Sequence, residues 1–117
     1  MLYLGVMIQE IYIPTYKTKI KVFNNKETLK RLYPKVKFNI VKDSEAYSCK
    51  VGGEYLMYLS SQDVSLITHE SLHISWYILS DRDIESTSAS HEAQAYLLEY
   101  IVKSINELKW NKEKLIS

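Results

Sequence analysis

The sequence is poor in the residues that mark disulfide-rich, linker-rich and membrane-spanning chains. It has one cysteine, three glycines and two prolines among 117 residues. A single cysteine, Cys49, cannot form an internal disulfide, and this favours a reducing compartment, so we expect a cytoplasmic protein. The least charged stretch, residues 65–80, still contains histidines, serines and a glutamate, which argues against a transmembrane helix. Residues 1–9 are apolar but lack the basic start and cleavage site of a signal peptide, and they indicate a strand.

The overall composition is that of an ordinary globular domain, with 46% hydrophobic and 25% charged residues. A chain of this length forms one hydrophobic core, so we expect a single domain over residues 1–117. The net charge of +1 conceals an asymmetry. Residues 17–50 carry ten lysines and arginines against three acids, whereas residues 51–117 carry five against ten.

The basic first half raises the question of a nucleic-acid partner, because lysines and arginines bind phosphates. Lys17, Lys19 and Lys21 alternate with other residues, however, as the exposed face of a strand does. The aromatic and glycine-rich contacts of nucleic-acid-binding modules are missing. A nucleic acid is therefore the less favoured partner.

Alternating and β-branched residues predict strands in the first half of the chain. Gly52-Gly53 predicts a hairpin turn, because glycine adopts the positive φ of primed turns. Asn25 is a suitable N-cap for a short helix that ends before Pro34. The elements expected here are strands at 2–13, 16–23, 36–41, 46–51 and 54–59 and a helix at 26–33.

The second half predicts two helices. Ser60 and Asp63 resemble a capping box, and we expect a helix over residues 60–80. Glu70 is its one formally charged residue between 65 and 79, so we expect this helix to be buried on most sides.

An acidic, serine-rich connection follows, in which Ser88 or Ser90 is the expected cap of the next helix. Apolar residues at helical spacing predict that this last helix covers residues 91–108. Strands followed by helices indicate an α+β fold, with a small mixed or antiparallel sheet.

The first of these two helices contains His69-Glu70-Ser71-Leu72-His73, which is an H-E-x-x-H sequence. Residues four apart share one face of a helix, with Cβ atoms about 5–6 Å apart, so both imidazoles can bind one metal ion. Imidazole is a good Zn²⁺ ligand, and Glu70 is placed to act as a general base. The alternative is a pair of core histidines satisfied by hydrogen bonds. An uncharged helix that holds two of the three histidines of the chain favours the metal site.

Two neighbours at the start of the last helix compete for the role of third ligand. Glu92 follows His73 after eighteen intervening residues, and His91 precedes it directly. The helical spacing leaves both open, because His91 shares a flank with Leu98 whereas Glu92 shares a side with Tyr96.

H-E-x-x-H followed at this distance by a helical glutamate resembles the gluzincin metallopeptidases, and the match covers residues 60–108. The resemblance implies a zincin-like domain in which His69, His73 and Glu92 bind Zn²⁺ and Glu70 is the general base. It also implies that the strand 54–59 is the sheet edge that lines the substrate cleft.

Residues 92–97 also resemble small zincin-like proteins encoded by bacteriophages, which implies a minimal single-domain zincin in the cytoplasm of a host cell. The chain departs from the larger gluzincins at two positions. His91 stands where the aminopeptidase branch has asparagine, and Tyr96 stands where the thermolysin-like branch has an acid. Substrate specificity is therefore not transferred.

We therefore expect a zinc-dependent hydrolase, a metallopeptidase whose peptide substrate pairs with the strand 54–59. His91 and Tyr96 are candidates for contact with the substrate or for support of the ligands. The alternative is a non-catalytic, metal-stabilised module, of phage origin, that binds or inhibits a host protein or binds nucleic acid. Its motivation is size, because 117 residues leave little room for the second lobe of a substrate cleft. Four protein ligands would favour this alternative, whereas an open coordination position would favour catalysis.

Overall fold

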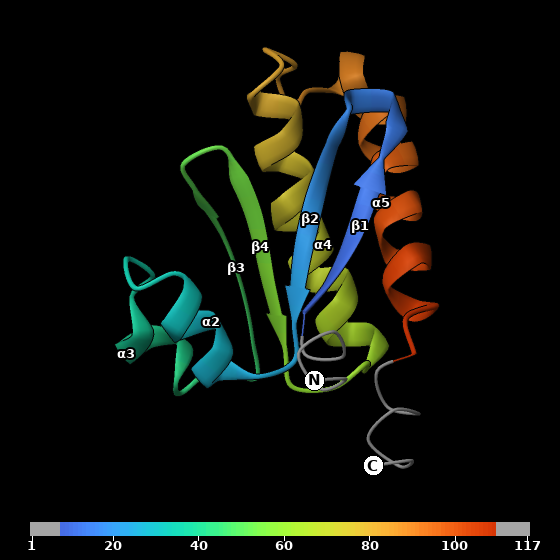
Figure 1. Ribbon diagram of the computed structural model, residues 1–117. Helices are drawn as coiled ribbons and strands as arrows, with labels where there is room; N and C mark the ends of the chain where they lie inside the picture. Colours follow the sequence, from blue (N-terminus) through green and yellow to red (C-terminus); the bar gives the residue numbers. More distant parts are fainter. Residues whose placement is uncertain (1–7, 110–117) are drawn as a thin grey trace.

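The computed structural model describes residues 8–109, which form a four-stranded mixed sheet with helices on both faces (Figure 1). The strand order is β1-β2-β4-β3; β2 is parallel to β4, and the other neighbours are antiparallel. This arrangement confirms the α+β fold. The elements are β1 (Ile8–Ile13), η1 (Pro14–Tyr16), β2 (Thr18–Phe23), α2 (Lys26–Leu32), α3 (Phe38–Val41), β3 (Ala46–Val51), β4 (Glu54–Leu59), α4 (Val64–Ser80), η2 (Ser88–Ser90) and α5 (His91–Asn106).

The two long helices α4 and α5 cover one face of the sheet (Figure 1). They run antiparallel, because Gln62, just before α4, donates to the carbonyls of Ile105 and Leu108 at the end of α5. Side chains alternate between the two faces of each strand, and those on the face toward α4 and α5 form the sheet's part of this core. Its buried members are Ile11, Ile13, Ile20, Val22, Tyr55, Met57, Leu59, Ile67, Ile74, Ile78, Leu79, Leu97, Ile101 and Ile105.

A smaller apolar cluster lies on the opposite face, under α2 and α3. Phe23, Leu56 and Tyr58 from the sheet pack against residues of the segment that carries the two short helices. Asn25 caps α2 as expected, since its side-chain oxygen accepts a hydrogen bond from the Thr28 amide at 2.8 Å. The rest of this face is polar and carries the exposed Lys19.

The expectation that residues 54–59 form the sheet edge is wrong. β4 lies inside the sheet, with β2 on one side and β3 on the other. Its backbone hydrogen-bonding groups are therefore engaged on both sides, and a peptide substrate cannot add to it as a further strand. The strand beyond β4 is β3, which lies against α4.

Three further expectations need correction. Residues 36–41 form no strand: Val36 and Val41 are buried, and the helix α3 occupies the end of the segment. The cap of α4 is Asp63 itself, which accepts from the Ser65 amide at 2.8 Å, in place of a box that begins at Ser60.

The third correction concerns the burial of α4, which is not covered on most sides. Its inner face is buried, but its outer face carries exposed histidines together with Trp76 and Tyr77, which are 42% and 37% exposed. The hairpin at Gly52-Gly53 is confirmed, and Gly52 has a φ of +62°. The expected strand residues 2–7 lie outside the described residues. Among residues 8–109, no helix is long and apolar enough to cross a membrane.

Candidate metal centre

The histidines of the H-E-x-x-H sequence lie on the outer face of α4, on the side away from the sheet. The inner side of the helix is fixed by Ile67, Ile74 and Ile78, which are fully buried in the core between sheet and helices. At about 100° per residue, His69 and His73 are on the opposite side of the helix from these isoleucines. Both are exposed. The amphipathic packing of α4 therefore places the pair in solvent.

The two imidazoles converge. The Nε2 atoms of His69 and His73 are 3.3 Å apart, and the ring centroids are 4.9 Å apart. Two nitrogens at this distance either share one hydrogen or bind one cation between them. The donor chemistry fits zinc, because two ligands at Zn–N distances of about 2.0–2.1 Å in a tetrahedral site lie about 3.3 Å apart.

Glu70 points to a different place from its histidine neighbours. It is 7% exposed, and its Oε1 accepts a hydrogen bond of 2.6 Å from Ser48 Oγ on β3. A buried carboxylate needs such a partner, since an unpaired one is costly. Among the described residues, Oε2 accepts no hydrogen bond. The structure thus brings Glu70, His69 and His73 onto one turn of helix, with the carboxylate held toward the sheet and the imidazoles toward solvent.

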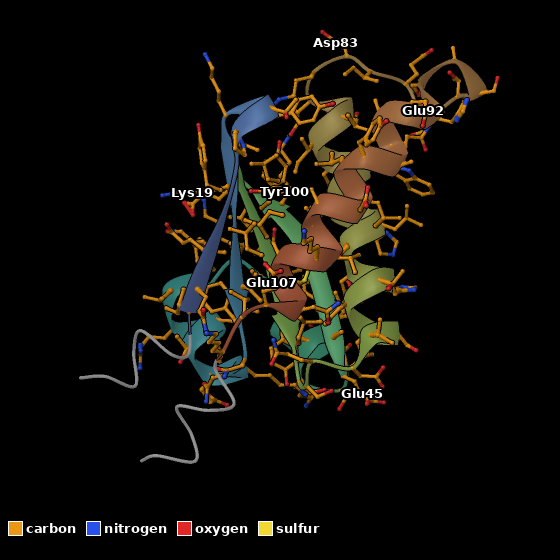
Figure 2. The ribbon with its side chains drawn as sticks, turned by 90° about the vertical axis from the view of Figure 1, so that its right-hand side faces the viewer. Lys19, Glu45, Asp83, Glu92, Tyr100 and Glu107 are labelled. Carbon is orange, nitrogen blue, oxygen red and sulfur yellow. The ribbon has the colours of Figure 1, made fainter. Side chains whose placement is uncertain are left out.

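The first turn of α5 does not bring a third ligand to the pair. Trp76, one turn after His73, donates to Gln94 Oε1 at 3.3 Å, so the side of α5 that carries Gln94 faces α4. Glu92 is two residues before Gln94, which places it roughly 160° away around the helix. It is exposed at the end of α5 nearest Asp83 (Figure 2). Among residues 8–109, no group of three or more His, Cys, Asp and Glu is arranged to hold a metal ion.

His91 and Tyr96, the other candidates on α5, are also exposed. Tyr96 is 69% exposed and lines a cavity of about 490 Å³ together with Tyr16 and Tyr100. Tyr100 donates to the backbone oxygen of Tyr12 at 2.7 Å, which ties α5 to β1. The surroundings of Tyr96 are therefore the β1 side of α5. The roles of Glu92, His91 and Tyr96 stay predictions.

The lysines of β2 lie on the open face of the sheet, where carboxylates pair with them. Lys19 is 3.4 Å from Glu10, and Lys21 is 3.0 Å from Glu54. Tyr33 joins the second pair: it donates to Glu54 and accepts from Lys21 at 2.9 Å. Hydrogen bonds from Tyr33 and then Lys21 lower the pKa of Glu54, and bonds to Tyr33 and Glu54 raise the pKa of Lys21. These contacts pair two of the ten basic side chains of residues 17–50 with carboxylates.

Cys49 offers no second reactive centre. It is a free cysteine on β3, partly buried against the smaller apolar cluster. Burial raises the pKa of its thiol to about 11. The thiolate is the form that attacks and binds metals, so this side chain is an inert packing group at neutral pH.

Sequence reasoning missed two residues that shape the site, Ser48 and Gln94. The signal for Ser48 was present, because the hairpin register pairs it with Met57 and so directs it to the helix-covered face. Gln94 accepts from Trp76 and donates to Thr87 O and Ser90 Oγ, each at 3.1 Å. Nothing in the local sequence distinguishes this amide from a solvent-facing one.

No protein-family model matches the chain, and neither a curated protein nor a solved structure is significantly similar to it. The likeness to the gluzincins therefore depends on the H-E-x-x-H sequence and on the spacing of Glu92. It stays a prediction that experiments on the protein itself must test.

Proposed function

We propose that this protein is a zinc-dependent hydrolase that cleaves peptide bonds. The observation that carries the proposal is the 3.3 Å approach of His69 Nε2 to His73 Nε2 beside a buried glutamate. An exposed histidine on a helix has many rotamers, and convergence of two on one point is the arrangement that a shared cation needs. Zn²⁺, when bound, would supply Lewis acidity and lower the pKa of a water to about 7.

Glu70 is the general base in this proposal. Ser48 occupies its Oε1, which leaves Oε2 as the oxygen that takes a proton and returns it to the leaving amine. The hydrogen bond holds the carboxylate toward β3, so Glu70 must change its side-chain rotamer to reach a water beside the imidazoles. General acid–base catalysis typically contributes about 10²–10⁴-fold to rate.

The space proposed for a peptide substrate is a cavity that Trp76 lines, one turn after His73, although His69, Glu70 and His73 do not line it. Its volume is about 760 Å³, and its walls come from the end of α4 and the connection to α5. Gln94 fixes the Trp76 indole at one side of it. The cavity is lined by Trp76, Ser80, Asp83, Ile84, Glu85, Ser86, Thr87, Ala89 and Ser90.

Glu92 is our proposed third ligand, with His91 as the alternative. Both belong to the first turn of α5, and that turn must rotate to bring Glu92 toward the pair. Zinc titration of Glu92→Gln and His91→Ala variants decides between them, because loss of one of three ligands weakens binding whereas loss of a bystander does not. We place the protein in the cytoplasm, where its single cysteine stays reduced.

A non-catalytic binding module is the second candidate function. The observation that favours it is the size of the chain, because 117 residues leave little room for the second lobe of a substrate cleft. Such a module would use the metal for structure and would show no hydrolysis of any substrate.

The test is a comparison of the wild-type chain with Glu70→Gln on a library of unlabelled peptides, read by mass spectrometry with zinc present. We expect cleavage by the wild type, and a loss of at least about 100-fold in Glu70→Gln with zinc affinity retained. A Glu70→Gln variant as active as the wild type would refute the role of Glu70. Zinc binding without any cleavage would favour the binding module.

A further inference from the structure

His69 and His73 present half of a metal site to solvent. Both side chains are exposed on the outer face of α4, and their Nε2 atoms are already 3.3 Å apart. A metal ion bound there would be held by two protein atoms and would keep its remaining positions directed away from the molecule. Two imidazoles are fewer ligands than zinc takes from protein in either its structural or its catalytic sites.

The chain does not complete the site from its own described residues. No group of three or more His, Cys, Asp and Glu is arranged for a metal in the range 8–109. The nearest carboxylate in sequence, Glu70, is buried and bound to Ser48. Glu92 is exposed and lies roughly 160° around α5 from Gln94, whose side faces α4. The missing ligands must come from outside this arrangement.

A second copy of the chain supplies the required number. Rotation about a two-fold axis through the metal brings in another His69 and His73, and the resulting four imidazoles form the closed tetrahedral shell that zinc prefers in structural sites. A two-fold interface joins a surface to itself, so the surface must not repel its own copy.

The outer face of α4 meets this condition. The helix has one formally charged residue, Glu70, and that residue is buried. On α4 itself, the exposed side chains that two copies would bring together are therefore uncharged or belong to the histidine pair. Trp76 and Tyr77 lie one turn beyond His73, are 42% and 37% exposed, and are of the types that anchor protein interfaces.

We propose that two copies of this protein share one zinc ion through His69 and His73 of each copy. The inference rests on the proposed function, because it uses the same ligand pair, His69 and His73. It adds a dimeric form of the zinc site to the single-chain form. With four imidazoles bound, no coordination position is open, so the zinc-bridged dimer is the closed, inactive form of the hydrolase. A single chain with its own third ligand is the open form.

The experiment measures molar mass and metal content of the full chain during titration with zinc chloride. Light scattering coupled to size-exclusion chromatography should show a change from monomer to dimer, complete at one zinc per two chains and reversed by a chelator. Cobalt in place of zinc should give the intense visible absorption of a tetrahedral ion. His73→Ala should stay monomeric, whereas Thr68→Ala, an exposed substitution on the same helix, should dimerise like the wild type.

The outcomes separate this inference from the proposed function. One zinc per chain in a monomer supports the hydrolase with its own third ligand and overturns the shared site. No zinc binding overturns both. A dimer that forms equally without zinc, or that persists in His73→Ala, overturns the shared site alone. Circular dichroism of each variant checks that the exposed substitutions leave the fold intact.

Discussion

Two clusters of polar side chains on opposite faces of the molecule differ in how completely their members are satisfied. On the open face of the sheet, Lys21, Tyr33 and Glu54 bond to one another, with Lys21 3.0 Å from Glu54. On the outer face of α4, the nitrogens of His69 and His73 have only each other, at 3.3 Å, among the described residues.

The two clusters differ in the charges that they bring together. In the sheet cluster each charge has its opposite, and the pKa values move in the directions that mutual pairing produces. The histidine pair brings together two groups of the same kind and leaves donor capacity directed at solvent. Polar groups whose partner is not among the described residues are the better candidates for binding.

The largest expected effect is on metal binding. Replacement of either histidine, in His69→Ala or His73→Ala, should weaken zinc binding by at least about 100-fold, since each ligand contributes several kcal/mol to a zinc site. The measurement is competition with a chromophoric chelator. Unfolding free energy should change by less than about 0.5 kcal/mol, because both side chains are exposed.

The sheet cluster provides the contrast for this prediction. Lys21→Met also removes a polar group, but it should leave zinc affinity unchanged within about twofold. Lys21 lies on the open face of the sheet, whereas His69 and His73 lie on α4, on the other side of the sheet. Equal losses of zinc affinity in His73→Ala and Lys21→Met would contradict the assignment of zinc binding to the histidine pair.

A medium effect is expected at Ser48. Ser48→Ala removes the partner of a buried carboxylate and should lower the free energy of unfolding by about 1–3 kcal/mol at pH 7. Ser48→Thr retains the hydroxyl and suits a strand, so it should recover most of the loss. Urea denaturation measures both. A Ser48→Ala variant with the unfolding free energy of the wild type would show that the hydrogen bond from Ser48 does not stabilise the Glu70 carboxylate.

The smallest effect is a pH-dependent one at Glu54. Its pKa is lower in the folded chain than the ordinary 4.5, because Tyr33 and Lys21 stabilise the carboxylate. Its contribution is therefore present above about pH 4.5 and is lost as the pH falls through the folded value. Glu54→Gln should lower the free energy of unfolding by less than about 1 kcal/mol at pH 7, since the side chains of Lys21 and Glu54 are 27% and 46% exposed.

The difference in unfolding free energy between wild type and Glu54→Gln should be smaller at pH 3 than at pH 7. Glu99→Gln, at an exposed glutamate with no ion pair in the described part of the chain, is the control and should be neutral at both pH values. A Glu54→Gln deficit that is as large at pH 3 as at pH 7 would assign the effect to packing, not to charge.

Local signals in the sequence predicted most of the fold correctly. The Gly52-Gly53 hairpin, the Asn25 cap and the start of the last helix at His91 all follow from backbone chemistry within a few residues. The prediction of a strand at residues 36–41 was wrong. Alternation over six residues does not distinguish a short strand from a bend followed by a turn of helix, and in this segment Val36 and Val41 are buried.

The position of β4 shows how a family resemblance can override a physical signal. Residues 55–59 are five consecutive apolar side chains, and all are buried. Such a run is typical of a strand covered on both faces, which is an interior strand. The edge assignment came from the likeness to zincins, and the composition of the strand already opposed it.

In the candidate site, too, the sequence predicted one part correctly and could not predict another. Convergence of His69 and His73 follows from helical spacing, which is local and reliable. The placement of Glu92 depends on how α5 is rotated against α4, and that rotation is set by contacts such as Trp76 with Gln94. Spacing along the chain contains no information on this rotation, so the third ligand could not be derived.

The most direct test of the account is ¹⁵N NMR of the imidazole rings during addition of zinc. The chain has three histidines, so the spectrum is simple to assign with single-residue variants. We predict that the Nε2 signals of His69 and His73 shift together and saturate, while His91 reports whether the start of α5 takes part. Unchanged signals of the His69 and His73 rings at saturating zinc would contradict the central claim that these two nitrogens hold a metal ion.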